Sequence, residues 1–162
     1  MTIFDSLCAL KAWKGFLTLM NKKSWLGFMW STAAFPLSIV EAGISPILIA
    51  VQNGHYQVVK VLLAAGADNN TAQNGDITPI WMAAFHGHER VVKMLLVAGA
   101  YVNTADKNGA TPISIAARKG HHRVVEMLIA AGADMSAAMG DGRTPILVAA
   151  QKGYHQVVAM LL

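Results

Sequence analysis

The sequence predicts an all-α solenoid of stacked helix pairs, and three series of residues carry this prediction. Prolines stand at positions 46, 79, 112 and 145 and glycines at 54, 87, 120 and 153, so both series repeat every 33 residues. Alanine, paired valines and leucine recur in the same register, beginning with Ala50, Val58, Val59 and Leu62. A fixed period of this length is the signature of stacked units that cannot bury their apolar faces alone.

Each period begins with a short helix. A hydroxyl residue precedes every repeated proline, which is the pattern of an N-cap followed by proline at the first helical position. These residues are Ser45, Thr78, Thr111 and Thr144. The helix that starts at Pro46 is expected to end at Gly54, because glycine tolerates the left-handed backbone that follows helix C-termini. The recurring alanine lies within this helix, where a small side chain allows close packing.

A second helix follows in each period. Its apolar residues recur at i, i+1, i+4 and i+5, as in Val58, Val59, Leu62 and Leu63, and so form one face. Glycines at 66, 99 and 132 end these helices. The segments after them, such as 69–76 and 103–109, are rich in Asn, Asp and Gly and are predicted to form projecting turns. Isolated helices below about 12–15 residues are marginal in water, so stacking must supply the stability.

Several short strings in this register resemble the ankyrin repeat. They are Thr111-Pro112-Ile113, Gly120-His121, Val124-Val125, Leu128 and Ala131-Gly132-Ala133-Asp134. The resemblance covers residues 43–162, as units 43–75, 76–108, 109–141 and an incomplete 142–162. It implies antiparallel helix pairs stacked into a slightly curved array, whose turn tips and first helices line a concave groove that contacts partners.

The sequence departs from the family pattern at three places. The histidine that usually follows Thr-Pro-Leu is absent, so a typical hydrogen bond between units is expected to be missing; the residues present are Leu48, Trp81, Ser114 and Leu147. In the turn Asn74-Gly75-Asp76, the glycine comes one place early and Asp76 takes the position of Gly109. The chain stops at Leu162 with no closing cap, so fraying or weak self-association of an otherwise monomeric protein is expected there.

Residues 1–42 do not carry the motif. Shifting the repeat back by one period places Trp25, Leu26, Met29 and Trp30 on the apolar columns of a second helix, so this segment is interpreted as a degenerate capping repeat. The alternative is a membrane or export segment within residues 16–40. Its apolar run is shorter than the ~20 residues that span a bilayer, and it contains Pro36.

Composition narrows the class of protein. The chain has 162 residues, of which 54% are hydrophobic and 14% charged, which fits one domain and excludes an ordinary disordered chain. A single cysteine, Cys8, allows no intrachain disulfide and no multi-cysteine zinc site, so a cytoplasmic location is expected, with membrane association as the alternative. The net charge of +4 is dispersed along the chain, and nucleic acid is not an expected partner.

Residues that carry chemistry are few. His55, His88 and His121 recur at the repeat spacing after a glycine, which indicates a structural role at the start of the second helices rather than a metal site. The sequence contains no phosphate-binding glycine loop, nucleophile elbow or pair of apolar-embedded carboxylates. No catalytic residue, metal or cofactor is therefore predicted. Asn69-Asn70-Thr71 matches a glycosylation sequon, whose simpler interpretation is a turn.

The positions that vary between units are the candidates for partner binding. They lie at the ends of the first helices and at the turn tips, which the resemblance places along the concave groove. The candidate set is Gln52, Asn53, Asn74, Trp81, Phe85, His86, Lys107, Arg118, Lys119, Arg143, Gln151 and Lys152. Its aromatic cluster and its cations favour an acidic peptide or protein with an apolar anchor. For Trp81, burial between units is the alternative.

The predicted function is that of a non-catalytic protein-protein interaction module or scaffold. One alternative is a membrane-tethered adaptor anchored by residues 16–40. Another is an accessory repeat fragment of a larger enzyme.

Overall fold

The computed structural model describes residues 45–162, which lie in a compact unit spanning Ile39–Leu162. Within this range the regular elements are helices in four consecutive pairs. The pairs are α4 (Pro46–Gln52) with α5 (Tyr56–Ala64), α6 (Pro79–His86) with α7 (Glu89–Val97), α8 (Pro112–Lys119) with α9 (His122–Ala130), and α10 (Pro145–Lys152) with α11 (His155–Met160). The predicted all-α helical repeat solenoid is confirmed. The segment 1–42, interpreted as a cap or a membrane segment, lies outside the described residues.

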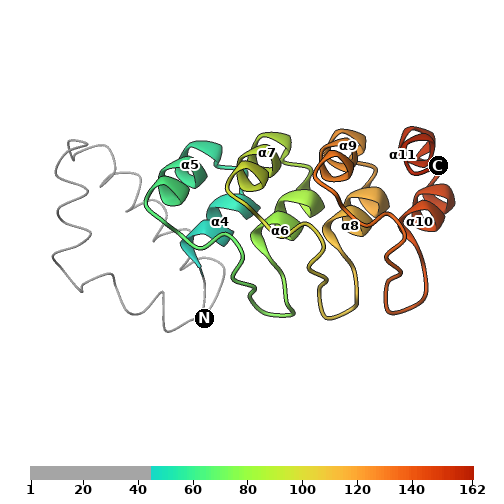
Figure 1. The fold of residues 1–162 in the computed structure, drawn as a ribbon, viewed down its shortest axis with the longest axis horizontal. Helices are drawn as coiled ribbons and strands as arrows, with labels where there is room; N and C mark the ends of the chain where they lie inside the picture. Colours follow the sequence, from blue (N-terminus) through green and yellow to red (C-terminus); the bar gives the residue numbers. More distant parts are fainter. Residues whose placement is uncertain (1–44) are drawn as a thin grey trace, which may run out of the picture. The chain divides into compact units, whose positions relative to one another are not determined.

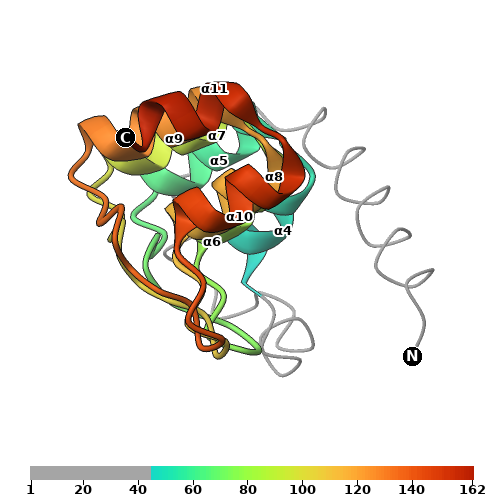
Figure 2. The ribbon, with the colours of Figure 1, turned by 90° about the vertical axis from the view of Figure 1, so that its right-hand side faces the viewer.

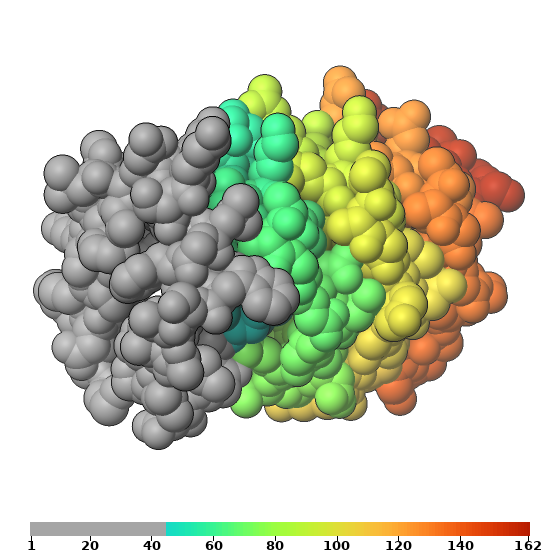
Figure 3. Space-filling view, turned by 60° about the vertical axis from the view of Figure 1, so that its left-hand side comes forward, coloured from blue at the N-terminus to red at the C-terminus, as the bar shows by residue number. Residues whose placement is uncertain are grey.

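The helices form two rows. Figure 1 shows the first helices, α4, α6, α8 and α10, in one row, the second helices, α5, α7, α9 and α11, in another, and the turns projecting beyond the first row. The helices within each row overlap one another when the stack is viewed along its length (Figure 2). The units follow one another as adjacent bands on the surface (Figure 3). Packing between units is densest between consecutive first helices, so the first helices make most of the helix contacts that join the units.

Every first helix begins at its proline, as predicted. Each residue before the proline has extended backbone, but only the hydroxyls of Thr78 and Thr111 accept a hydrogen bond from the N–H three residues on, at 3.3 and 3.4 Å. Ser45 and Thr144 make no such bond. The glycine that follows each first helix has a φ between 66° and 77°, the left-handed conformation that the sequence predicts.

The repeated columns face the interior of the stack. Fully or almost fully buried members are Ile47, Ile80, Ile113, Ala50, Ala83, Ala116, Ala149, Val59, Val92, Val125, Leu95 and Leu128. They belong to one continuous apolar cluster that runs through the units. The periodicity therefore identifies the core correctly, and burial of these side chains is the main source of stability.

Asparagines join the turns of neighbouring units. Oδ1 of Asn70 accepts the N–H of Tyr101 at 2.8 Å, and Oδ1 of Asn103 accepts the N–H of Asp134 at 2.8 Å. Nδ2 of each asparagine donates to a carbonyl of the following unit at 3.4 Å. The two asparagines lie one period apart in the sequence, and this repetition is the signal from which their shared role could have been predicted.

Histidines join the helices of neighbouring units. Nε2 of His88 lies 3.1 Å from the carbonyl oxygen of Gln52, and Nε2 of His121 lies 3.2 Å from that of Phe85. Each imidazole covers the repeated glycine of the preceding unit, where an added Cβ would come within 2.7–2.8 Å of the ring. The predicted structural role of these two histidines is confirmed. Tyr154 occupies the equivalent place in the last unit.

The expectation that a hydrogen bond between units is missing is wrong at Trp81. The indole Nε1 of Trp81 donates to the carbonyl oxygen of Ala110, in the following unit, at 2.9 Å. Trp81 therefore makes a hydrogen bond between units from a position at which such a bond was expected to be missing. In the next unit the hydroxyl of Ser114 lies 2.9 Å from that of Thr111 and bonds within its own unit.

The turn at residues 73–77 has an unusual backbone. Gln73 and Ile77 pair across it as an antiparallel bridge. Gly75 has φ +85°, and Asp76, with φ +63°, is the one non-glycine residue of positive φ between positions 45 and 162. Gly109 takes the position of Asp76 in the following turn, with φ +76°. The early glycine therefore leaves an aspartate in a conformation that L side chains adopt at a cost.

Candidate partner-binding face

The ends of the first helices carry a row of accessible side chains, which we call the helix-end row. Its members are Gln52, Asn53, Phe85, His86, Arg118, Lys119, Gln151 and Lys152. Phe85 and Arg118 are half-buried and the other six are exposed. Because the first helices pack side by side (Figure 1), the row runs from unit to unit across the stack.

Phe85 is the centre of a contact cluster in this row. Its ring stacks on that of Trp81, with centroids 5.4 Å apart and planes 17° apart, and meets the edge of His86 at 4.9 Å. From the following unit, Nζ of Lys119 lies 4.2 Å from the centroid of the Phe85 ring. This is a cation-π geometry, which orients the ammonium beside an accessible aromatic surface.

The interpretation of Trp81 as an exposed contact is wrong. Only 6% of this residue is exposed, and its indole N–H is bonded to Ala110, so the alternative of burial between units holds. Phe85 also packs partly against the core, so this residue contributes to the packing of the array as well as to its surface. The ring of Trp81 packs against that of Phe85, and Phe85 is the more accessible residue of the pair.

The cations of the helix-end row have no carboxylate partner in the described part of the chain. Ion pairs there join Arg123 to Glu89, at 3.9 Å, and Arg143 to Asp141, at 2.5 Å. Neither pair involves Arg118, Lys119 or Lys152. These three positive charges are therefore available to an acidic ligand.

The comparisons with known proteins agree with the architecture. A family model described as ankyrin repeats in three copies matches residues 34–106 and again residues 80–162. The chain belongs to the ankyrin repeat family. None of the curated proteins matches it at a significant level. Ankyrin repeats generally act as protein-protein interaction modules.

The turn tips of the ankyrin array differ in charge from the helix-end row. Nε of Arg143 donates to Oδ2 of Asp141 at 2.7 Å, and this bond is the main reason that the pKa of the Asp141 carboxyl is lowered. The guanidinium of Arg143 is therefore already paired. Lys107 and Asn74 are exposed at their tips, and no recorded contact brings either of them, or Arg143, to the helix-end row.

The imidazole of His86 favours its neutral form. Partial desolvation by its neighbours lowers the pKa of the His86 side chain, and electrostatic repulsion from His88, Lys119 and His121 lowers it further. The His86 ring also stacks on that of His88, with centroids 5.5 Å apart. The lowered pKa favours the uncharged imidazole of His86 at neutral pH.

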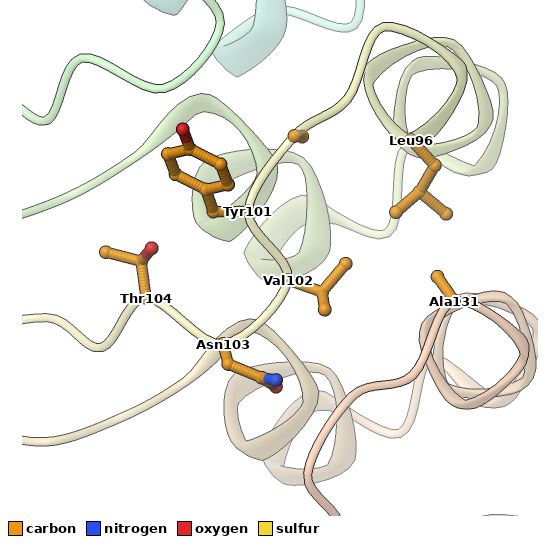
Figure 4. Close-up of a pocket in the computed structure, with 7 residues that line it drawn as sticks. Leu96, Tyr101, Val102, Asn103, Thr104 and Ala131 are labelled. Atoms are coloured by element: carbon orange, nitrogen blue, oxygen red, sulfur yellow. The ribbon is translucent and has the colours of Figure 1, made fainter.

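A shallow hollow of about 500 Å³ lies away from the helix-end row. It is lined by Leu96, Ala100, Tyr101, Val102, Asn103, Thr104 and Ala131 (Figure 4). Val102 points toward Leu96 and Ala131, whereas Tyr101 and Thr104 lie on the other side of the loop. Since its lining holds no charged side chain, the hollow does not share the chemistry of the candidate face.

The sequon asparagine has a structural role in the turn. Asn69 is only 7% exposed, and its Nδ2 donates to the carbonyl oxygen of Ala98 at 2.9 Å. The simpler interpretation, a turn residue, is therefore confirmed for the folded array.

The last two features, membrane-spanning helices and metal-binding groups, are described for residues 45–162 alone. None of their helices has the length and apolar character that crossing a bilayer requires. They also contain no group of three or more His, Cys, Asp or Glu side chains placed to bind a metal ion. The proposed tether at residues 16–40 lies outside this range.

Proposed function

We propose that this ankyrin array binds an acidic protein segment through the helix-end row, without catalysing a reaction. The observation that carries the proposal is the set of cations without a carboxylate partner, Arg118, Lys119 and Lys152, on consecutive first helices, with the ammonium of Lys119 over the ring of the half-buried Phe85. Carboxylates of the partner would pair with these cations, and an apolar side chain of the partner would cover Phe85. Interfaces concentrate their binding energy in such aromatic and arginine anchors.

The rigidity of the row supports this proposal. Phe85 is held by Trp81 from its own helix and by Lys119 from the next unit. The helix ends are fixed in turn by His88 and His121, whose rings contact the carbonyl of the last residue of α4 and that of the penultimate residue of α6. A surface that is already ordered loses little conformational entropy on binding, so more of the contact energy appears as affinity.

The experiment is a selection of peptides from a random display library on the immobilised full chain. Enriched sequences are expected to contain clustered Asp or Glu near an aromatic or aliphatic residue. Their binding to the double variant Arg118→Ala/Lys119→Ala should be weaker by about tenfold or more, since truncating interface anchors costs roughly 1–2 kcal/mol. Added salt should reduce the difference, because exposed charges are screened.

The matched control removes two exposed cations from the second helices, as Lys60→Ala/Lys93→Ala. Both double variants change the net charge by the same amount, so only the position of the charges differs. Equal loss of binding in the two variants, or enrichment of peptides without acidic residues, would contradict the proposal. The substitution Phe85→Leu is preferable to alanine for testing the anchor, because Phe85 also packs against Trp81.

A further inference from the structure

Three Asn-Gly dipeptides occur in the described residues, at 53–54, 74–75 and 108–109. Asn-Gly is the dipeptide most prone to deamidation, because glycine has no side chain to hinder attack of its backbone nitrogen on the preceding side-chain amide. All three asparagines are exposed, so solvent access does not distinguish them. Their hydrogen bonds do.

In two of the Asn-Gly pairs, both the glycine N–H and the asparagine side-chain amide are hydrogen-bonded. The N–H of Gly54 donates to the carbonyl oxygen of Val51 at 3.0 Å, and Nδ2 of Asn53 donates to that of Ile49 at 2.8 Å. The attacking nitrogen and the amide under attack are therefore both bonded at the end of α4.

Both reacting groups are also hydrogen-bonded in the Asn-Gly pair at 108–109. The N–H of Gly109 donates to the carbonyl oxygen of Asp106 at 2.8 Å. Asn108 is bonded to the Asp106 carboxylate through its backbone N–H at 2.9 Å and through Nδ2 at 3.5 Å.

The pair at 74–75 is different. Among the described residues, neither the N–H of Gly75 nor the side-chain amide of Asn74 has a hydrogen-bond partner. The reason lies in the sequence: Gly75 comes one place early, and Asp76 follows it in a left-handed conformation. The turn therefore lacks the bond that Gly109 makes across its own tip.

We propose that Asn74 is a site of spontaneous, water-dependent deamidation. The nitrogen of Gly75 loses its proton to hydroxide and attacks Cγ of Asn74, and ammonia leaves as a five-membered succinimide forms. Water then opens the ring at either carbonyl and yields aspartate or isoaspartate. The net reaction consumes one water and releases one ammonia for each carboxyl group formed.

The product alters a contact between neighbouring tips. The carbonyl oxygen of Gly75 accepts the N–H of Lys107 at 2.9 Å, and the side chain of Lys107 lies against Gly75. Isoaspartate adds a methylene group to the backbone immediately before this contact. A new carboxylate would also repel an acidic segment near the tips; this consequence alone rests on the proposed function.

The test measures deamidation at all three sites in one sample. The full chain is aged at mildly alkaline pH, digested, and analysed by mass spectrometry with separation of the aspartate and isoaspartate peptides. Breaking one hydrogen bond of about 1 kcal/mol before attack slows a reaction about fivefold, so Asn74 should react at least about fivefold faster than Asn53 and Asn108. In denaturant the three rates should converge.

Equal rates in the folded protein, or faster reaction at Asn53 or Asn108, would overturn the proposal. Asn74→Gln should abolish the fast signal without slowing the other two sites. The variant Asn74→Asp, compared with Asn74→Gln, tests the consequence for an acidic peptide separately. Because the mass measurement needs no partner, failure of the proposed function would leave its outcome unchanged.

Discussion

The imidazole of His121 lies over Gly87 of the preceding unit, so closely that a Cβ on Gly87 would come within 2.7 Å of the ring. The same ring places Nε2 3.2 Å from the carbonyl oxygen of Phe85. The contact thus requires an aromatic ring in one unit and a residue without a side chain in the other. It ties a core interface to the residue at the centre of the candidate binding face.

Replacing His121 by alanine is expected to lower the free energy of unfolding by about 1–2 kcal/mol, because the bond to Phe85 and the ring contact are lost. Urea denaturation measures this change. His55→Ala is the matched control, since His55 holds the same place in its unit but is exposed, and its side chain makes no hydrogen bond or ring contact with the described residues. A similar loss in both variants would mean that the contact between units contributes little.

Ala116→Leu is expected to destabilise the array by about 1–3 kcal/mol. Ala116 is completely buried in α8, within the continuous core, and a larger side chain there forces its neighbours apart. Thermal denaturation followed by circular dichroism measures the effect. Ala130→Leu, at the exposed end of α9, is the control and should leave the melting temperature almost unchanged. An unchanged melting temperature in Ala116→Leu would contradict the packing of this column.

Asp76→Gly is expected to stabilise the fold by about 0.5–1 kcal/mol. Glycine relieves the left-handed conformation at φ +63°, and this gain exceeds the extra freedom of the unfolded chain. Chemical denaturation is again the measurement. The reverse change at the equivalent position, Gly109→Asp, should destabilise strongly, because a Cβ there would lie 2.8 Å from the nitrogen of Gly140. Destabilisation by Asp76→Gly would show that the aspartate side chain stabilises the turn.

The stability of the array should fall as the pH decreases through 6.5. Partial desolvation and neighbouring positive charges lower the pKa of His86 in the folded state, so the unfolded chain binds the proton more readily. The loss begins as the unfolded histidine titrates and ends below the folded pKa. Melting temperatures between about pH 7.5 and 5 should therefore depend less on pH in His86→Asn than in the parent. Exposed His155→Asn is the control, and equal slopes in all three proteins would refute this role of His86.

The periodicity was sufficient to predict the helix pairs, their proline starts and their buried columns. The periodicity did not predict the burial of Trp81, because a residue at a repeated position can point either into the stack or out of it. The indole of Trp81 is held by the carbonyl of Ala110, which lies 29 residues away in the sequence. Phe85 is half-buried for the same reason, since its burial depends on Trp81. The pairing of Arg143 with Asp141 depends on the shape of a turn, which residue types alone do not fix.

The hydrogen bonds between units connect residues that are between 29 and 36 positions apart. Each such bond therefore closes a loop of about one period, and the entropy of that closure does not grow with the number of units. During synthesis, the end of α4 can gain its contact with His88 only after His88 has left the ribosome, and the end of α6 can gain its contact with His121 only after His121 has. Each newly made unit thus completes the one before it, and the array can fold in the order in which it is translated.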